Sequence, residues 1–173
     1  MTELIVIAHP AEAEYFDDCD VLITGPGKVN AAVRLSHYLS THPEVIKITV
    51  LGTAGRLNKE FPLHSIHTPS EAIQHDFFLR SDSVPTEGTP GVTIATGDFF
   101  LTDSEYGRKI GADMVDMEAY SYASVAYEFG IPLTIHKYLS DDADGEADAL
   151  WIETISEISK KLREYYDTTL SVV

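Results

Sequence analysis

Two acidic clusters of this chain each follow an apolar run that is typical of a buried strand. Residues 112–116 lead into Glu118, and residues 131–139 lead into Asp141. The segment between them, residues 120–129, has the pattern of a helix that ends at a glycine. Strand, helix and strand in this order predict a crossover between parallel strands, which would bring both carboxylates to the sheet edge where open α/β sheets bind ligands. Two carboxylates in one crevice indicate acid catalysis combined with recognition of hydroxyl groups.

The rest of the chain continues this alternation of short apolar runs and amphipathic segments. Residues 61–78 show no regular pattern, and residues 81–91, rich in Ser, Pro, Thr and Gly, are expected to form a loop. Alternating strands and helices predict an α/β fold with a mainly parallel sheet, and the length fits a single domain over residues 1–173. Further strands are expected at residues 4–8, 21–24, 45–51 and 92–95, helices at 30–39 and 147–166, and a turn at 97–100.

The composition limits the partners and the compartment. The formal charge of −16 argues against binding to nucleic acids or anionic membranes, because phosphate contacts need Lys and Arg. Cys19 is the only cysteine, which excludes an internal disulfide. No apolar run approaches the ~20 residues of a membrane-spanning helix, and no basic segment leads into an apolar one at the N-terminus. We therefore expect a soluble, cytoplasmic protein.

Two glycine-rich segments follow predicted strands. Gly25-Pro26-Gly27-Lys28 resembles a phosphate loop only in part, because Val29 stands where a Ser or Thr would bind magnesium and the first glycine is missing. A tight turn between strand and helix is the favoured interpretation. Residues 52–55 could bring backbone N–H groups close to a ligand, but a plain turn is again favoured.

Neither the histidines nor the acidic run predicts a metal site. His64, His67 and His75 have spacings that match no known zinc pattern, and no cysteine joins them. The acidic residues at 141–146 do not fall at EF-hand positions, so composition alone favours a solvated loop. We expect no metal and no cofactor. His9, just after the first predicted strand, is better placed to line a ligand pocket.

Six segments together resemble the purine nucleoside phosphorylase and nucleosidase superfamily, and within it most of all the 5′-methylthioadenosine/S-adenosylhomocysteine nucleosidases. Six matches in the family's order are far more specific than any single one. The resemblance implies a three-layer α/β/α fold with a mixed, mainly parallel central sheet. The segments are IAHPAE at 7–12, GPGKVNAA at 25–32, GTAGRL at 52–57, TGDFFL at 96–101, VDMEA at 115–119 and SDDAD at 140–144.

The resemblance also implies roles for individual residues. Asp141 matches the general acid that protonates the purine N7, supported by Ser140, and Glu12 matches the residue that activates the attacking water. His9 and Asp116 stand where relatives carry Met and Glu near the sugar. The remaining matches would bind substrate: Glu118 and Met117 the ribose, Phe100 and Leu101 the base, and Thr53 and Ala54 the water or phosphate side.

The chemistry agrees with these roles. Cleavage of an N-glycosidic bond builds positive charge on the sugar and negative charge on the base, so it needs an acid near the base and anionic groups near the sugar. An Asp donates a proton at neutral pH only if its pKa is raised, and Asp142 and Asp144 are candidate neighbours for that effect.

The predicted activity is therefore hydrolysis of a purine nucleoside such as 5′-methylthioadenosine or S-adenosylhomocysteine. No Arg occurs before Arg34, and residues 50–51 before the second glycine segment are apolar, so a phosphate clamp is missing, although Arg56 and Lys28 remain available. A phosphate-dependent phosphorylase, a non-catalytic nucleoside-binding protein and a flavin-binding flavodoxin-like domain are the alternatives.

Relatives in the family are dimers or larger, so the resemblance implies a homodimer. Phe77, Phe78 and Tyr106 are the candidates for its interface. Only twelve residues separate Glu12 from Gly25, where relatives carry an extra strand pair that shapes the 5′ side of the pocket. The accepted 5′ group and purine therefore stay open.

Overall fold

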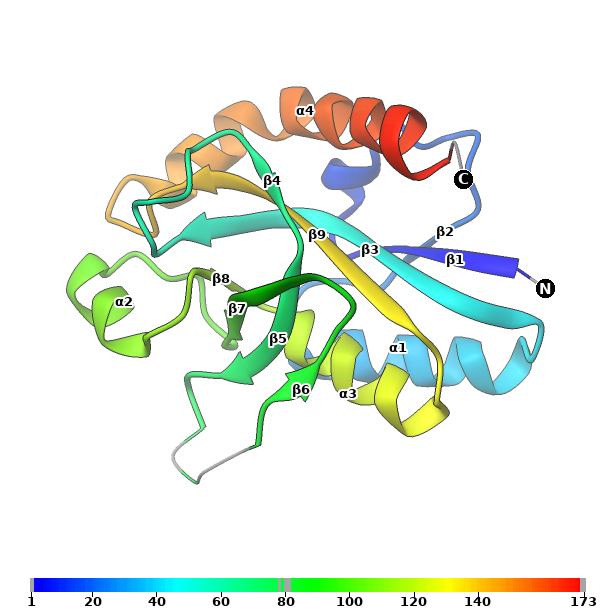
Figure 1. The fold of residues 1–173 in the computed structure, drawn as a ribbon. Coiled ribbons are helices and arrows are strands. Elements are labelled where there is room, and N and C mark those ends of the chain that lie inside the picture. The colour runs from blue at the N-terminus through cyan, green and yellow to red at the C-terminus, as the bar shows by residue number, and fades with distance from the viewer. Residues whose placement is uncertain (1, 78, 80–81, 172–173) are drawn as a thin grey trace.

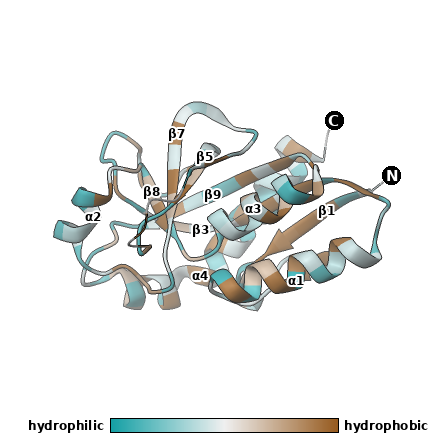
Figure 2. Ribbon diagram, turned by 90° about the horizontal axis from the view of Figure 1, so that it is seen from below, coloured by the Kyte–Doolittle hydropathy of each residue, from teal (hydrophilic) through white to brown (hydrophobic). Residues whose placement is uncertain are grey.

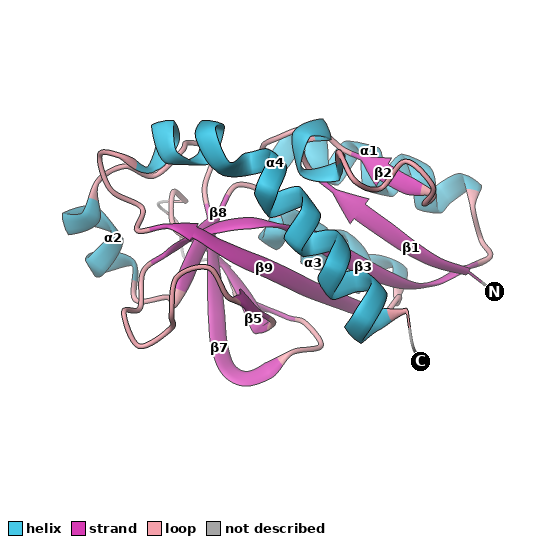
Figure 3. Cartoon of the chain, turned by 90° about the horizontal axis from the view of Figure 1, so that it is seen from above, coloured by secondary structure: helices cyan, strands magenta, loops and turns pink. Residues whose placement is uncertain are grey.

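The computed structural model describes residues 2–77, 79 and 82–171, and it places one sheet between two layers of helices. Helices α1 (Lys28–Thr41) and α3 (Ala119–Phe129) cover one face, and α4 (Ala147–Tyr165) covers the other (Figure 1). Figure 3 shows α4 lying across β3 and β9. Helix α2 (Ser104–Ile110) stands at one end of the sheet. The predicted three-layer α/β/α fold is confirmed.

Within the described residues, nine strands form the sheet, in the order β2-β1-β3-β8-β7-β5-β6, with β9 pairing with β3 and β4 pairing with β9. Five of the pairings are parallel: β1–β2, β1–β3, β3–β9, β5–β7 and β7–β8. The pairs β3–β8, β4–β9 and β5–β6 are antiparallel. The strands are β1 Thr2–Ile7, β2 Val21–Ile23, β3 Val45–Arg56, β4 Ile66–His67, β5 Pro69–Gln74, β6 Val84–Pro85, β7 Thr89–Thr96, β8 Met114–Asp116 and β9 Leu133–Asp141.

The crossover predicted from the two acidic clusters is wrong in one respect. Strand β9 runs parallel to β3, but β8 pairs with the end of β3 in the antiparallel direction. The reason is the length of β3, which continues beyond the end of β1 and leaves an edge free for β8. Gly55 in β3 consequently pairs with Val115 of β8 and with Asp141 of β9. The two acidic clusters still meet, because both strands reach the same residue of β3.

The prediction of a turn at residues 52–55 is also wrong, because these residues belong to β3. Pairing with β9 along the whole segment outweighs the turn preference of the two glycines. A Cβ at Gly52 would lie 3.3 Å from both Glu12 Oε1 and Lys137 Nζ, so the missing side chain lets charged groups approach the strand. The turn predicted at residues 25–28 is confirmed, since it joins β2 to α1.

Two segments without a clear pattern contain short strands. Residues 61–78 hold β4 and β5, and residues 81–91 hold β6 and the first residues of β7. These short strands and the residues around them are held by backbone hydrogen bonds to distant residues. One example is the bond from the Glu87 N–H to the Leu133 carbonyl, at 2.8 Å. Such pairing depends on tertiary contacts and leaves no local sequence pattern. The C-terminal end of α4 continues as a π-helical turn, Tyr166–Leu170.

The hydrophobic core has one part on each face of the sheet. On the first face, α1 buries Ala31, Leu35 and Leu39, spaced four apart, against α3 and the strands. Figure 2 shows the strongly apolar β1 beside these helices. On the second face, Ile158 and Leu162 of α4 pack on the sheet. No helix in the part of the chain that the structure describes is long and apolar enough to cross a membrane.

A buried histidine between the sheet and α4 predicts sensitivity to acid. His136 of β9 is 5% exposed, and its Nδ1 lies 3.0 Å from Thr68 Oγ1 and 3.2 Å from Tyr165 Oη. Burial, aided by Lys47, lowers the pKa of His136 to about 4. A depressed folded-state pKa means that the unfolded chain binds the proton first, so stability is lost as pH falls from about 6.5 towards 4.

Between pH 7 and 4.5 the native protein should lose a certain amount of its free energy of unfolding. We expect His136→Gln to lose about 2 kcal/mol less over the same pH range. Urea unfolding at the two pH values measures this difference. His37→Gln, on the exposed side of α1, is the control and should keep the native acid dependence. Equal losses in the native protein and His136→Gln would show that other groups dominate the acid response.

Candidate active site

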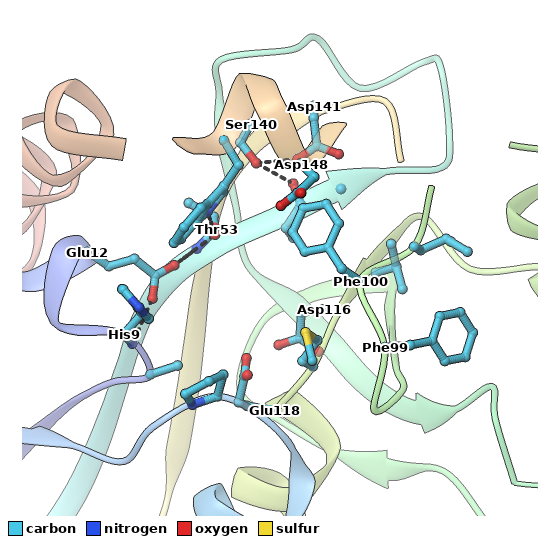
Figure 4. Close-up of a pocket in the computed structure, with 18 residues that line it drawn as sticks. His9, Glu12, Thr53, Phe99, Phe100, Asp116, Glu118, Ser140, Asp141 and Asp148 are labelled. Atoms are coloured by element: carbon cyan, nitrogen blue, oxygen red, sulfur yellow. Dashed lines mark hydrogen bonds between the residues drawn. The ribbon is translucent and has the colours of Figure 1, made fainter. Parts of the chain in front are cut away.

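A cavity of about 310 Å³ opens where β3, β8 and β9 converge (Figure 4). Every residue that the sequence predicted for the site lines this cavity, from His9 near the N-terminus to Asp141 in β9. The eleven residues are His9, Glu12, Thr53, Ala54, Phe100, Leu101, Asp116, Met117, Glu118, Ser140 and Asp141. Prediction missed seven further lining residues: Ala8, Pro26, Gly55, Phe99, Val115, Asp148 and Trp151.

Asp141 ends β9 at one side of the cavity and is 3% exposed. Its Oδ2 accepts a hydrogen bond from Ser140 Oγ at 2.6 Å, and its Oδ1 accepts one from the Ala143 N–H at 2.9 Å. Burial is the largest influence and raises the pKa of Asp141; Asp144 and Asp142 add to the increase, and the two hydrogen bonds oppose it. The environment therefore favours a carboxyl group that can hold a proton.

Glu12 lies across the cavity from Asp141, in the 3-10 turn Pro10–Ala13 that follows β1 (Figure 4). Its Oε1 accepts hydrogen bonds from the Thr53 N–H at 2.8 Å and from Thr53 Oγ1 at 2.7 Å. Its Oε2 accepts the His9 N–H at 3.2 Å, while His9 Nδ1 accepts the Ala11 N–H, also at 3.2 Å. This reciprocal cap holds a 4% exposed carboxylate in one orientation.

Glu118 lies at the start of α3, on the floor of the cavity. Its Oε1 accepts the Gly27 N–H at 2.8 Å, which joins the loop before α1 to the site. Burial, followed by the charge of Asp116, raises the pKa of Glu118 to about 8, and Lys137 acts in the opposite direction. A ligand that donates hydrogen bonds to a group with this pKa would favour the ionised form of the group and lower its pKa.

Asp116 and Lys137 form a buried ion pair behind Glu118. Lys137 Nζ lies 2.8 Å from Asp116 Oδ2, and both side chains are 2% exposed. Asp116 also accepts hydrogen bonds from Thr96 Oγ1 at 2.7 Å and from the Ala119 N–H at 2.9 Å. The nearby carboxylates of Asp116, Glu118 and Glu12 outweigh burial and raise the pKa of Lys137, so the amine stays charged. Asp116 lines the cavity, and both of its oxygens are already bonded.

The aromatic wall comes from the loop after β7. Figure 4 shows the Phe100 ring turned towards Asp141 and Asp148, with Phe99 farther from them. Leu101 is buried beside this wall, whereas Phe100 is 39% exposed. Asp98 Oδ1 accepts the Lys28 N–H at 2.7 Å and thereby ties the loop to α1.

Of the residues predicted for an interface, Phe77 is half exposed and Tyr106 is partly buried. The Tyr106 hydroxyl donates to the His75 carbonyl at 3.0 Å. Phe78 lies outside the described residues. The structure thus leaves the predicted interface open.

The two cations considered as phosphate ligands point elsewhere. Lys28 Nζ pairs with Asp76 at 2.7 Å, and Arg56 Nε pairs with Asp142 at 2.7 Å. Among the described residues that line the cavity there is no Lys or Arg, whereas five of them are Asp or Glu. The cavity is therefore an anionic environment. In the same described part of the chain, no three His, Cys, Asp or Glu side chains are arranged to hold a metal ion.

Trp151, Asp148 and Lys137 were missed because their surroundings gave no sign of a site. The amphipathic pattern of α4 directs attention to its apolar face, and Asp148 and Trp151 lie near the helix start that overhangs the cavity. Lys137 lies in the middle of β9, a strand that is buried along most of its length. A lysine inside such a strand, and the only tryptophan of the chain, were the available signals.

Comparison with known proteins finds similar sequences and similar folds. The Phosphorylase superfamily model matches residues 87–171. The 5′-methylthioadenosine/S-adenosylhomocysteine nucleosidase of Staphylococcus carnosus is 28% identical, over 94% of this chain and 86% of that protein. The enzyme of the same name from Exiguobacterium sp. is 29% identical, over 82% of this chain and 76% of that protein. The chain is therefore similar to the phosphorylase superfamily over residues 87–171, and to nucleosidases over most of its length.

Solved structures agree on the fold. Helicobacter pylori 5′-methylthioadenosine/S-adenosylhomocysteine nucleosidase, solved with butyl-thio-DADMe-Immucillin-A, superposes with a TM-score of 0.87 at 18% identity, over 100% of this chain and 99% of that chain. A futalosine hydrolase mutant of Helicobacter pylori strain 26695 gives a TM-score of 0.85 at 18% identity, over 100% of both chains. These two structures show the fold, and the sequence relatives above are nucleosidases.

Proposed function

We propose that this protein hydrolyses the N-glycosidic bond of a purine nucleoside, with 5′-methylthioadenosine and S-adenosylhomocysteine as candidate substrates. The observation that carries the proposal is the placement of two buried side chains across one cavity: Asp141, whose pKa burial raises, and Glu12, which hydrogen bonds hold in one orientation. Reactions at a sugar carbon use two carboxyl groups in this way, one for the leaving group and one for the nucleophile.

In the proposed reaction the C1′–N9 bond breaks and its electron pair passes to the departing purine. Asp141 donates its proton to N7 of the base, with Ser140 holding the carboxyl in place. The water oxygen forms the new bond to C1′, and Glu12 Oε2 accepts the proton that the water loses. The anionic cavity stabilises the positive charge that develops on the sugar.

Glu118 is the proposed partner of the ribose hydroxyls. Its raised pKa is caused mainly by burial, so two hydroxyl donors would stabilise its ionised form. Met117 would pack against the sugar. Phe100 would stack on the base, and the Leu101 backbone would bind its edge, since both lie on the aromatic wall beside Asp141. Ala54 and Thr53 would line the side from which water attacks.

The lining of the cavity supports hydrolysis over phosphorolysis. Phosphate is usually held by Arg or Lys, and the described lining residues offer only carboxylates and neutral groups. No cation among these described residues would offset the charge of a dianion. A phosphorylase and a non-catalytic binding protein remain the alternatives. The exposed Phe99 and Phe100 at the cavity, together with the exposed Phe77, are the observation that favours a homodimer.

The test incubates the purified protein with methylthioadenosine, S-adenosylhomocysteine, adenosine and inosine, with and without phosphate, and measures free base. We expect release without phosphate, unchanged when phosphate is added. Release that requires phosphate would replace the proposal with a phosphorylase. Binding of a nucleoside by calorimetry without any base release would replace it with a binding protein.

A further inference from the structure

A chain of hydrogen bonds leads from α4 to the proposed water-activating carboxylate. Trp151 Nε1 lies 2.9 Å from Thr53 Oγ1, and Thr53 Oγ1 lies 2.7 Å from Glu12 Oε1. The three residues come from α4, β3 and the turn after β1, which are far apart in the sequence. All three line the cavity. These hydrogen bonds therefore connect α4, the helix that overhangs the cavity, to Glu12.

The chemistry of the three groups fixes the direction of each bond. An indole N–H is a donor only, so Thr53 Oγ1 must accept from Trp151. The Glu12 carboxylate has no proton to donate, so the single hydroxyl proton of Thr53 is directed to Glu12, its other hydrogen-bond partner among the described residues. Without the indole, the hydroxyl could rotate and donate to another acceptor or to water instead. Trp151 thus helps to keep the Thr53 hydroxyl oriented towards Glu12.

Because Thr53 donates to Glu12, the two oxygens of Glu12 have different numbers of hydrogen bonds and different roles. Oε1 accepts two hydrogen bonds, from the Thr53 N–H and hydroxyl, at 2.8 and 2.7 Å. Among the residues that the structure describes, Oε2 accepts one hydrogen bond, the longer one from the His9 N–H at 3.2 Å. Oε2 is consequently the oxygen with spare capacity to accept a proton from water.

Trp151 is itself held in place by the same group of residues. The His9 ring packs against the indole edge at a centroid distance of 5.4 Å and an interplanar angle of 81°. Nearby, the Tyr15 N–H donates to Ser159 Oγ at 3.3 Å and ties the turn after β1 to α4 a second time. The contacts form a closed circuit from Glu12 through Thr53 and Trp151 to His9 and back to Glu12. Figure 4 shows its Glu12, Thr53 and His9 members.

We propose that Trp151 is a positioning residue for hydrolysis, which acts through Thr53 to hold Glu12 with Oε2 free for the attacking water. The inference rests on the proposed function for its catalytic consequence, whereas the hydrogen-bond circuit can be tested without any activity. Helix α4 thereby helps to position Glu12, the residue that activates the attacking water, in addition to closing the cavity.

The kinetic test uses Trp151→Phe, which keeps an aromatic ring and removes the donor. We expect kcat to fall about tenfold, the size of one lost hydrogen bond between neutral groups at the upper end of the usual range, with KM changed less than about twofold. Thr53→Val removes the connection, so adding Trp151→Phe to it should lower kcat by less than a further factor of about two. Thr53→Ser keeps the hydroxyl and should retain most of the turnover. Equal effects of Trp151→Phe in both backgrounds would show a packing role and overturn the proposal.

The second test reads the circuit directly, because the chain has one tryptophan and hence one indole N–H signal. In a proton–nitrogen correlation spectrum of labelled protein, we expect this signal to exchange slowly with solvent and to shift in Glu12→Gln. Thr53→Val should abolish its protection. A signal that is insensitive to both substitutions would refute the circuit, whether or not the protein proves to be a nucleosidase. An intact circuit in a protein without activity would instead refute the proposed function alone.

Discussion

Replacing Asp141 with Asn is expected to lower kcat by about 10²–10⁴-fold, with little change in nucleoside binding. The amide keeps the shape of the side chain and can still accept from Ser140 or Ala143, but it carries no proton that it could give to the leaving base. Because Asn has the size of Asp and burial already disfavours the ionised form of Asp141, the substitution should also leave the fold intact. Initial rates and calorimetric affinities for the best substrate provide the two measurements.

Asp142→Asn is the matched control, because it makes the same chemical change one residue later. Asp142 pairs with Arg56 at 2.7 Å and Lys59 at 2.5 Å and does not line the cavity among the described residues. We expect its turnover to remain within about tenfold of the native value. An Asp141→Asn enzyme with full activity would eliminate Asp141 as the general acid.

Lys137→Met is expected to reduce the free energy of unfolding by about 3–5 kcal/mol, because it leaves a buried carboxylate without its partner. Lys137 is 2.8 Å from Asp116, and the charges of Glu118 and Glu12 also act on its amine. Without that positive charge, three acidic groups would share one buried region. Chemical denaturation at neutral pH measures the loss.

Two comparisons separate the buried pair from a general effect of charge. Lys47→Met breaks an ion pair with Glu3 at 3.0 Å, where the two side chains are 42% and 32% exposed, and should cost less than about 1 kcal/mol. The double variant Asp116→Asn with Lys137→Met should be more stable than Lys137→Met alone, since it also removes the orphaned anion. A Lys137→Met protein as stable as Lys47→Met would show that the buried pair contributes little.

Much of the fold was predictable because its parts have local patterns. The helix at residues 119–129, its terminal Gly130 with φ of 66°, and the apolar stripe of α1 follow from spacing alone. The course of β3 did not follow, because Gly52 and Gly55 favour turns in isolation. Only pairing with β8 and β9, which is a tertiary contact, keeps them extended. Local preference was overruled there.

The candidate site shows the same division. Residues within recognisable segments, such as Glu12, Glu118 and Asp141, were predicted and line one cavity. Trp151 belongs to no such segment, and its importance arises from a contact with Thr53 that spans 98 positions of the sequence. The roles of all these residues remain predictions. A sequence pattern can identify residues that belong to a site. The contacts between those residues depend on the tertiary structure, which brings distant parts of the chain together.

Gly55 lies between the two acidic clusters and fixes the distance between them. Its neighbours Val115 and Asp141 are set by strand pairing on both sides, and a Cβ at this position would lie 3.0 Å from Ala143 Cβ and 3.1 Å from Asp141 Oδ1. The separation of the two acidic clusters is thus a property of the backbone and does not depend on side-chain rotamers. During divergence, loops around the cavity can lengthen or shorten and change the accepted substrate. The spacing that the chemistry needs stays constant as long as this one position remains without a side chain.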